Sequence, residues 1–318
     1  MTPQSAGPWL APAGTAIASV LLFIAPWFIP GLGVLWVIWT PLPLIMAYRL
    51  RGPIPGRLAL GLALAGGLML GQVFDAKVDG LYFLFHGAIV LVLGEAPYRR
   101  VGEPLALGLS AMAGVTAGAA LLLWAGLSPG NESLEVWWAV WQQEMDTFMA
   151  ASRQAGMDSE SLRELRSALV QTGRLVWRLA PGTLCAGSLV LAWSNLLMAR
   201  TLTRRLKPQE PPPEPLTRWQ APERLVWLLI AAGGVTWIAE GWLSWAGLNA
   251  LLPLAVIYFL QGIAVMAYWL EKKKAPRMLR AGLYALVAVE VFLALLVALA
   301  GLFDLWFNFR RLNSKQSA

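Results

Sequence analysis

Four polar side chains interrupt stretches of this sequence that are otherwise almost entirely apolar. Glu290 lies near the middle of the last long apolar stretch, and Gln261 lies in the stretch before it. His86 belongs to an earlier stretch, and Glu240 lies close to the end of another. Ionisable groups inside a membrane are costly to bury, which makes them functional candidates. We therefore take these four side chains as candidate residues for binding a substrate or a proton.

Counting along two antiparallel helices places Glu290 and Gln261 at one depth, about 13 Å from the membrane boundary. His86 falls at a similar depth in its own stretch, whereas Glu240 is near enough to an end to reach water. Two interpretations stay open. The three deeper groups can form one ligand or proton site. Alternatively, a protonated Glu290 can hydrogen-bond Gln261 and simply hold two helices together, with His86 as a packing residue.

An aromatic stripe marks a different kind of segment, between two of the apolar stretches. Trp137, Trp138, Trp141, Met145 and Phe148 recur at spacings of three and four residues, and polar residues fill the opposite face. This spacing predicts an amphipathic helix on the outer side of the membrane. The stripe can rest on the outer leaflet, cover an outward-facing cavity as a lid, or contact a partner protein.

Motifs for enzymatic chemistry do not occur in the sequence. It contains no Gly-x-x-x-x-Gly-Lys-Ser/Thr phosphate loop, no His-Glu-x-x-His pair and no Gly-x-Ser-x-Gly turn. Cys185 is the single cysteine and His86 the single histidine, which excludes an internal disulfide and any multi-histidine metal site within one chain. We expect no enzymatic activity, no metal and no cofactor.

The elements that position these residues follow from composition. Of the 318 residues 58% are hydrophobic and only 14% are charged, whereas a soluble domain has about a quarter charged residues. About 20 apolar residues cross a bilayer as a helix. The stretches lack the alternation of a β-barrel strand. The sequence thus predicts an all-α, polytopic membrane protein with about nine spans, at 9–29, 32–48, 58–74, 80–95, 104–126, 176–199, 225–246, 249–270 and 281–303.

Basic residues lie mainly on one side of these spans. With a cytoplasmic N-terminus, most of the 25 Lys and Arg residues fall in inner loops, as the positive-inside rule requires. Residues 1–8 lack the basic start of a signal peptide, so the first stretch is expected to remain as a span. Arg310 and Arg311 do not fit the positive-inside rule, because a ninth crossing would place them on the outer side. The charge pattern explains the net charge of +7 without nucleic acid.

A proline-rich segment, Pro208–Pro215, divides the chain. Proline favours extended structure, which predicts a stiff cytoplasmic linker. We expect a six-span unit at 1–200, which includes an outer helical loop at 127–178. A basic linker follows at 201–223, and a three-span unit occupies 224–318.

Several short segments resemble the YybS-like family of bacterial polytopic inner-membrane proteins of unknown function. The segments are Trp219-Gln-Ala-Pro-Glu223, Asn249, Tyr258-Phe-Leu-Gln-Gly-Ile-Ala264, Gly301-Leu-Phe-Asp-Leu-Trp-Phe-Asn-Phe-Arg310, Leu179-Ala-Pro181 and Asn195. The resemblance implies a bacterial inner-membrane location. It also implies a fold related to the six-span substrate-binding components of energy-coupling-factor importers, which borrow an ATPase; the three extra spans depart from that pattern.

The resemblance also draws attention to Asp304 and Arg310, which flank an aromatic turn. They can pair with each other or with lipid head groups, or the aromatic residues between them can act as an interfacial anchor.

Two functions of different classes follow as expectations. The first is small-molecule binding or transport at an intramembrane polar site that contains Glu290 and Gln261. The second is a non-transporting scaffold that recruits a protein partner through the linker and the outer aromatic helix. Membrane lipids are expected partners of either, and nucleic acid is not.

Overall fold

The computed structural model describes residues 10–29, 33–73, 77–127, 133–208 and 215–311, and this part of the chain is helical without strands. The proline-rich linker lies, apart from its ends, outside the described residues. In chain order the elements are α1 (Leu10–Phe28), α2 (Gly33–Val37), α3 (Pro41–Arg51), α4 (Pro53–Val73), α5 (Lys77–Glu95), α6 (Glu103–Leu127), α7 (Ser133–Gln154), α8 (Ser159–Leu206), the 3-10 turn η1 (Leu216–Arg218), α9 (Leu225–Ile238), α10 (Trp242–Lys272), α11 (Arg277–Val289) and α12 (Val291–Phe307).

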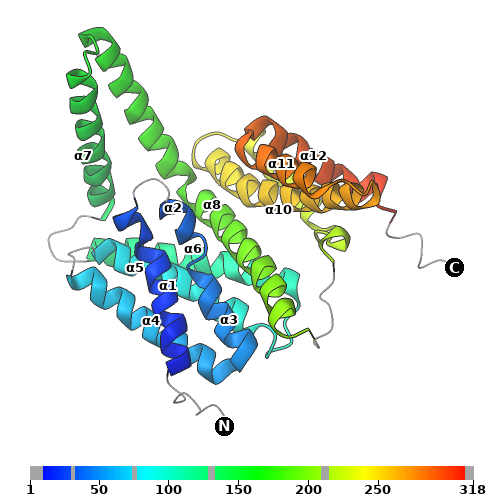
Figure 1. Ribbon diagram of the computed structural model, residues 1–318. Coiled ribbons are helices and arrows are strands. Elements are labelled where there is room, and N and C mark those ends of the chain that lie inside the picture. Colours follow the sequence, from blue (N-terminus) through cyan, green and yellow to red (C-terminus); the bar gives the residue numbers. More distant parts are fainter. Residues whose placement is uncertain (1–9, 30–32, 74–76, 128–132, 209–214, 312–318) are drawn as a thin grey trace.

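Helix α8 runs between two groups of helices (Figure 1). On one side α1 and α3–α6 pack around an apolar core. On the other side α10 packs against α8, α9 and α12. Helix α7 and the first half of α8 project away from both groups as a long hairpin (Figure 1).

Small residues let the helices of the first group approach closely. The ring of Tyr48 in α3 fills the space left by Gly56 of α4 and Gly94 of α5, where a Cβ atom would overlap it. Gly67 of α4 makes the same room for Phe83 of α5. Tight packing between backbones is the main attraction available to helices in lipid, so these glycines fix how α3, α4 and α5 fit together.

The predicted span 32–48 is wrong as a single helix, because the chain breaks between α2 and α3. Pro41 has no N–H to donate, and the break leaves backbone carbonyls without helical partners. Side chains satisfy them. Asn195 of α8 donates to the Ile38 carbonyl and Ser19 of α1 donates to the Thr40 carbonyl, each at 2.7 Å. A break inside an apolar bundle is tolerated only with such replacements.

Helix α8 extends far beyond its predicted span, over 48 residues. It begins within the predicted outer helical loop, where the Asp158 carboxylate caps its first turn by accepting from the Glu160 and Ser161 N–H groups. It continues through Pro181. There the Asn249 amide of α10 inserts into the helix, accepting from the Gly182 N–H at 2.6 Å and donating to the Arg178 carbonyl at 2.8 Å. Asn249 thereby ties α8 to α10.

The boundary between the seventh and eighth predicted spans is shifted. The sequence predicts helices over 225–246 and 249–270, whereas α9 ends at Ile238 and α10 begins at Trp242. Gly241 turns the chain at a φ of 64°, a left-handed conformation that glycine adopts without strain. Apolar periodicity alone does not reveal this turn, because tryptophans continue on both sides of it.

The predicted span 281–303 is also wrong as one straight helix. Helices α11 and α12 meet at Glu290 with a bend of 105°. Helix α12 instead packs against α10, where Gly262 and Gly301 bring the two backbones together. A Cβ atom at either glycine would overlap backbone atoms of the other helix.

Three helices of the described residues, α4, α8 and α10, are long and apolar enough to cross a membrane, and α11 with α12 makes a fourth if the bent pair is one span. Shorter apolar helices occur at Ala11–Pro26, Phe83–Glu95 and Leu225–Ile238. The all-helical architecture is confirmed, and the count of nine spans is not.

Candidate functional site

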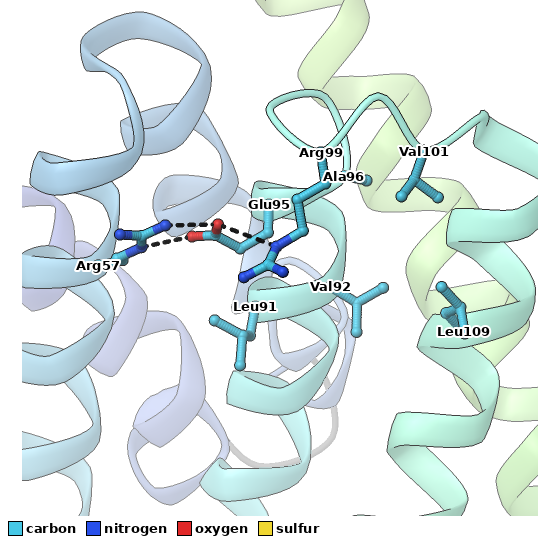
Figure 2. A pocket seen from close by; sticks show the side chains of 8 residues that line it. All are labelled: Arg57, Leu91, Val92, Glu95, Ala96, Arg99, Val101 and Leu109. Carbon is cyan, nitrogen blue, oxygen red and sulfur yellow. Dashed lines mark hydrogen bonds and ion pairs between the residues drawn. The ribbon is translucent and has the colours of Figure 1, made fainter.

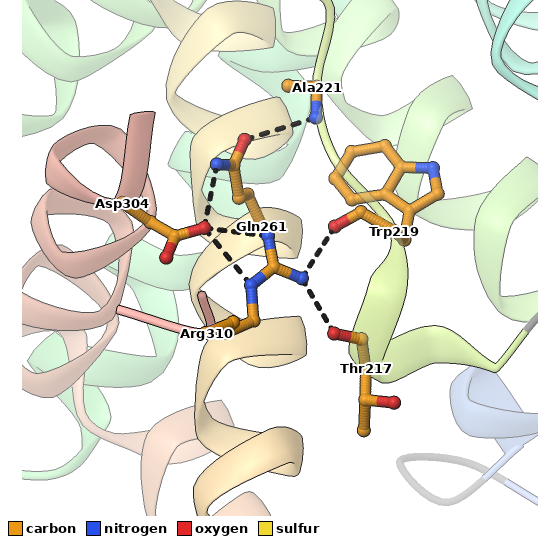
Figure 3. A network of polar contacts seen from close by, with 6 residues as sticks. All are labelled: Thr217, Trp219, Ala221, Gln261, Asp304 and Arg310. Carbon is orange, nitrogen blue, oxygen red and sulfur yellow. Dashed lines mark hydrogen bonds and ion pairs between the residues drawn. The ribbon is translucent and has the colours of Figure 1, made fainter. Parts of the chain in front are cut away.

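Two arginine–carboxylate arrangements stand out in the structure. The first, here called the clasp, consists of Gln261 on α10, Asp304 on α12 and Arg310 just after α12 (Figure 3). Arg310 donates from Nε and Nη2 to Asp304 Oδ2 at 3.1 and 2.7 Å. Gln261 donates to the same oxygen at 3.4 Å. Both charged side chains of the clasp are 0% exposed.

A turn at the end of α12 brings Arg310 into this position. Asn308 adopts a left-handed conformation with a φ of 41°, as asparagine often does after the last turn of a helix. The chain therefore reverses, and Arg310 points back toward Asp304. Of the two partners expected for this pair, each other or lipid head groups, the structure shows the first.

The clasp also holds the segment that follows the linker. Arg310 Nη1 donates to the Thr217 and Trp219 carbonyls, both at 2.8 Å, and the Ala221 N–H donates to Gln261 Oε1 at 3.1 Å. Figure 3 shows these bonds converging from three parts of the chain. Three of the segments that resemble the YybS-like family, around residues 219–223, 258–264 and 301–310, supply the network. The side chains of Asp304 and Arg310 lie sealed from solvent, so the clasp joins elements rather than offering an open site.

The other predicted site residues do not join Gln261. Glu290 is exposed at the bend between α11 and α12, and Glu240 is exposed in the turn before α10. His86 is 2% exposed in α5, with the rings of Phe23 and Phe85 at centroid distances of 5.8 and 5.5 Å. The predicted common depth of Glu290 and Gln261 assumed one straight helix over 281–303. The bend at Glu290 shows that this helix is not straight, so the predicted common depth does not follow.

The aromatic stripe of α7 faces its neighbour in the hairpin, at least in part. Trp141 packs against Gly173 of α8, where a Cβ atom would overlap the indole ring, and Met145 is buried. Trp138 is half-buried, and the side chain of Trp137 lies outside the described residues. Helix α7 contacts α6 and α8. The sequence predicts that the stripe rests on the outer leaflet, covers a cavity as a lid or contacts a partner protein. In the structure, part of the stripe instead packs on α8.

The second arrangement, here called the triad, consists of Arg57 on α4, Glu95 at the end of α5 and Arg99 in the turn that follows α5 (Figure 2). Arg57 donates from Nε and Nη2 to the two oxygens of Glu95, each at 2.7 Å, which is a bidentate pair. Arg99 Nε lies 3.7 Å from Glu95 Oε2. The side chains of Arg57 and Arg99 are 54% and 72% exposed, whereas that of Glu95 is 9% exposed.

A pocket of about 430 Å³ lies against the triad. Its remaining walls are apolar and come from α5, α6 and the loop between them (Figure 2): Leu91, Val92, Ala96, Val101 and Leu109. An apolar space with a few charged groups at one side is the usual form of a small-molecule site. This arrangement can hold an apolar body and hydrogen-bond a polar or anionic end.

Sequence reasoning missed this pocket. From the sequence, Arg57 and Arg99 are only two of the basic residues in the predicted inner loops, and the positive-inside rule explains their presence there. Glu95 is the signal that was available, since an acidic residue at the end of an apolar stretch can pair with arginines of a neighbouring helix. Only the fold shows that α4 and α5 bring the three together.

Comparison of the whole chain with known proteins finds a matching family. The family described as "Predicted membrane protein (DUF2232)" matches residues 16–305. The chain is 19% identical over 306 residues to the "Uncharacterized protein YybS" of Bacillus subtilis (strain 168), covering 89% of this chain and 91% of that protein. No solved structure matches. The resemblance to the YybS-like family is thus confirmed.

Proposed function

The chain belongs to the DUF2232 family of predicted membrane proteins, and from that premise we propose that it is a membrane-embedded small-molecule binding protein. The binding site is the pocket beside the triad. The single observation that carries the proposal is the combination of about 430 Å³ of apolar space with exposed arginine side chains at its edge. A ligand with an apolar body and a polar end satisfies both parts of this surface.

The pocket supports the proposal better than the residues first expected to bind. Gln261 already has partners inside the clasp, and Glu290 and Glu240 are exposed in separate turns. His86 packs among aromatic rings in another part of the molecule. These surroundings favour binding at the triad over transport through a site at Glu290.

Photocrosslinking from the wall of the pocket tests the proposal. Leu109 lines the pocket on α6 and is partly exposed, so a photoreactive phenylalanine analogue can replace it without burying new bulk. Met112 lies on the same helix, is exposed, and does not line the pocket, which makes it the matched control. In native membranes we expect position 109 to yield a discrete small-molecule adduct, identified by mass spectrometry, that position 112 does not yield.

The same adducts at positions 109 and 112, in the same proportions, would contradict the proposal. That result would mean that the pocket is an ordinary part of the lipid-facing surface.

A scaffold role is a second candidate, and the α7–α8 hairpin favours it. The hairpin extends beyond the helix groups (Figure 1), and it carries exposed apolar residues such as Phe148 and Met157 beside charged ones. A projecting hairpin of this kind is suited to contact another protein. If a stoichiometric protein partner copurifies with the unmodified chain and is lost with Phe148→Ser, the scaffold role gains support; copurification that is indifferent to the hairpin opposes it.

A further inference from the structure

We propose that the ligand of the triad pocket is an anionic phospholipid, whose phosphate group meets Arg57 and Arg99 while an acyl chain occupies the apolar walls. The proposal rests on the proposed function, because it assumes that the pocket binds a ligand at all. It adds the chemical class of that ligand and the orientation in which it lies.

The hydrogen-bonding capacity of the triad is only partly used. A guanidinium has five N–H donors in a fixed plane. Arg57 directs Nε and Nη2 to Glu95, which leaves its Nη1 group available. Arg99 approaches Glu95 only to 3.7 Å, so most of its donors are free to bind an anion. Phosphate oxygens are strong acceptors for such donors, and arginine matches their geometry.

The charge of the triad also favours a ligand with a negative charge. Two guanidinium groups face one carboxylate, so the triad keeps a net positive charge of one. A phosphodiester carries one negative charge and would neutralise it. A zwitterionic head group would bring its own cation near the two arginines, and like charges repel at short distance.

The apolar walls extend in the direction that an acyl chain needs. Leu91 and Leu109 line the pocket and are themselves 47% and 44% exposed. On α6, Leu105 continues the exposed apolar surface beside Leu109. A lipid can therefore place its head group at the triad and remain in contact with apolar side chains along α5 and α6, without leaving the bilayer.

The expected orientation of the chain agrees with this class of ligand. The charge pattern predicts that the end of α5 and the start of α4 lie at the cytoplasmic side. Anionic phospholipids attract basic segments at that surface. The triad adds a defined pocket to this general attraction, and a difference between pocket arginines and neighbouring surface arginines is the measurable consequence.

Reconstitution in mixed vesicles tests the inference. The protein with a photoreactive phenylalanine analogue at position 109 is placed in vesicles of equal parts phosphatidylglycerol and phosphatidylcholine, and the two lipid adducts are quantified by mass spectrometry. We expect phosphatidylglycerol adducts to predominate. Arg99→Gln should lower the ratio of phosphatidylglycerol to phosphatidylcholine adducts about fivefold, the effect of losing one charge-assisted hydrogen bond.

Arg100→Gln is the matched control. Arg100 is adjacent and exposed, and its replacement removes the same charge, but it does not line the pocket. It should leave the ratio unchanged, and millimolar inorganic phosphate added before irradiation should not lower the yield of the lipid adduct. Equal adducts of both lipids, or equal effects of Arg99→Gln and Arg100→Gln, would overturn the inference while leaving binding in the pocket intact. Loss of any distinction between positions 109 and 112 would instead contradict the proposed function.

Discussion

The clasp and the triad are built from the same chemical groups and differ in what surrounds them. In the clasp, Arg310 and Asp304 are fully buried, and the guanidinium donates to a carboxylate and to two backbone carbonyls. In the triad, Arg57 and Arg99 face one carboxylate and remain more than half exposed. The clasp holds three parts of the chain together, whereas the triad has donors left for a molecule from outside.

The difference shows that an arginine–carboxylate pair is not by itself a sign of function. Its role depends on which hydrogen bonds the protein has already filled and on whether a ligand can reach the rest. A buried pair is costly to disrupt because the remaining charge has no solvent. An exposed pair contributes little to stability, and its arginines can exchange partners.

The largest difference in stability is expected when one arginine of each region is replaced by glutamine. Arg310→Gln leaves the Asp304 carboxylate buried without its cation, and we expect unfolding free energy to fall by about 3–5 kcal/mol. Arg57→Gln removes an exposed side chain and should cost far less. Thermal unfolding of both variants in the same detergent measures the contrast, and equal losses of stability would remove the distinction between clasp and triad.

A substitution at the contact that supports the clasp should have the next largest effect. Gly301→Ala places a methyl group against the backbone of α10 at Tyr258 and Gly262, and we expect a loss of about 3 kcal/mol. Gly282→Ala in α11 is the control, since no atom lies near its added Cβ. Unfolding midpoints of the two variants should separate clearly, and a neutral Gly301→Ala would show that the close approach of α10 and α12 is unnecessary.

Gln261 and Glu290 provide a smaller test, which also separates the sequence prediction from the structure. Gln261→Ala leaves the buried Ala221 N–H without its acceptor, at a cost of about 1–2 kcal/mol. Glu290→Gln changes an exposed side chain and should leave both stability and adduct formation at position 109 unchanged. Loss of the adduct with Glu290→Gln, measured in the crosslinking experiment, would restore the site originally expected there.

The smallest effect is expected at an exposed carboxylate outside both arrangements. Hydrogen bonds from the Ser161 and Glu160 N–H groups, with the Ser161 bond contributing most, lower the pKa of Asp158. The capping contribution is therefore complete above the unfolded pKa of about 3.9 and is lost as pH falls through the lower folded pKa. Hydrogen exchange in the first turn of α8 should increase below that pH, and Asp158→Asn, which keeps an acceptor that does not titrate, should remove the pH dependence.

Much of the fold could be predicted from apolar stretches, because long runs of apolar residues have few alternatives to a helix in lipid. The ends of α1, α5 and α6 lie close to the predicted boundaries, and Asp158 marks the start of α8. The breaks could not be predicted from apolarity. The turn at Gly241 and the bend at Glu290 lie inside runs that remain apolar on both sides. The break between α2 and α3 is stabilised by Asn195 and Ser19, which come from other helices and which the local sequence does not reveal.

The candidate sites were less predictable because their members come from distant parts of the chain. Asp304 and Arg310 are six residues apart, and their pairing with each other was one of three expected alternatives. Gln261 is buried, and the side chain that it contacts is that of Asp304 rather than that of Glu290. The pairing of Arg57 with Glu95 depends on how α4 packs on α5, which neither sequence stretch encodes alone.

Chemical labelling of individual arginines tests the central claim most directly. The folded protein is treated with an arginine-specific dicarbonyl reagent in vesicles with and without phosphatidylglycerol, and modification is quantified residue by residue by mass spectrometry. We predict rapid modification of Arg99, slowed by phosphatidylglycerol, and no modification of Arg310 until the protein unfolds. Modification of Arg310 at a rate like that of Arg99, or modification of Arg99 that is indifferent to the anionic lipid, would contradict the account.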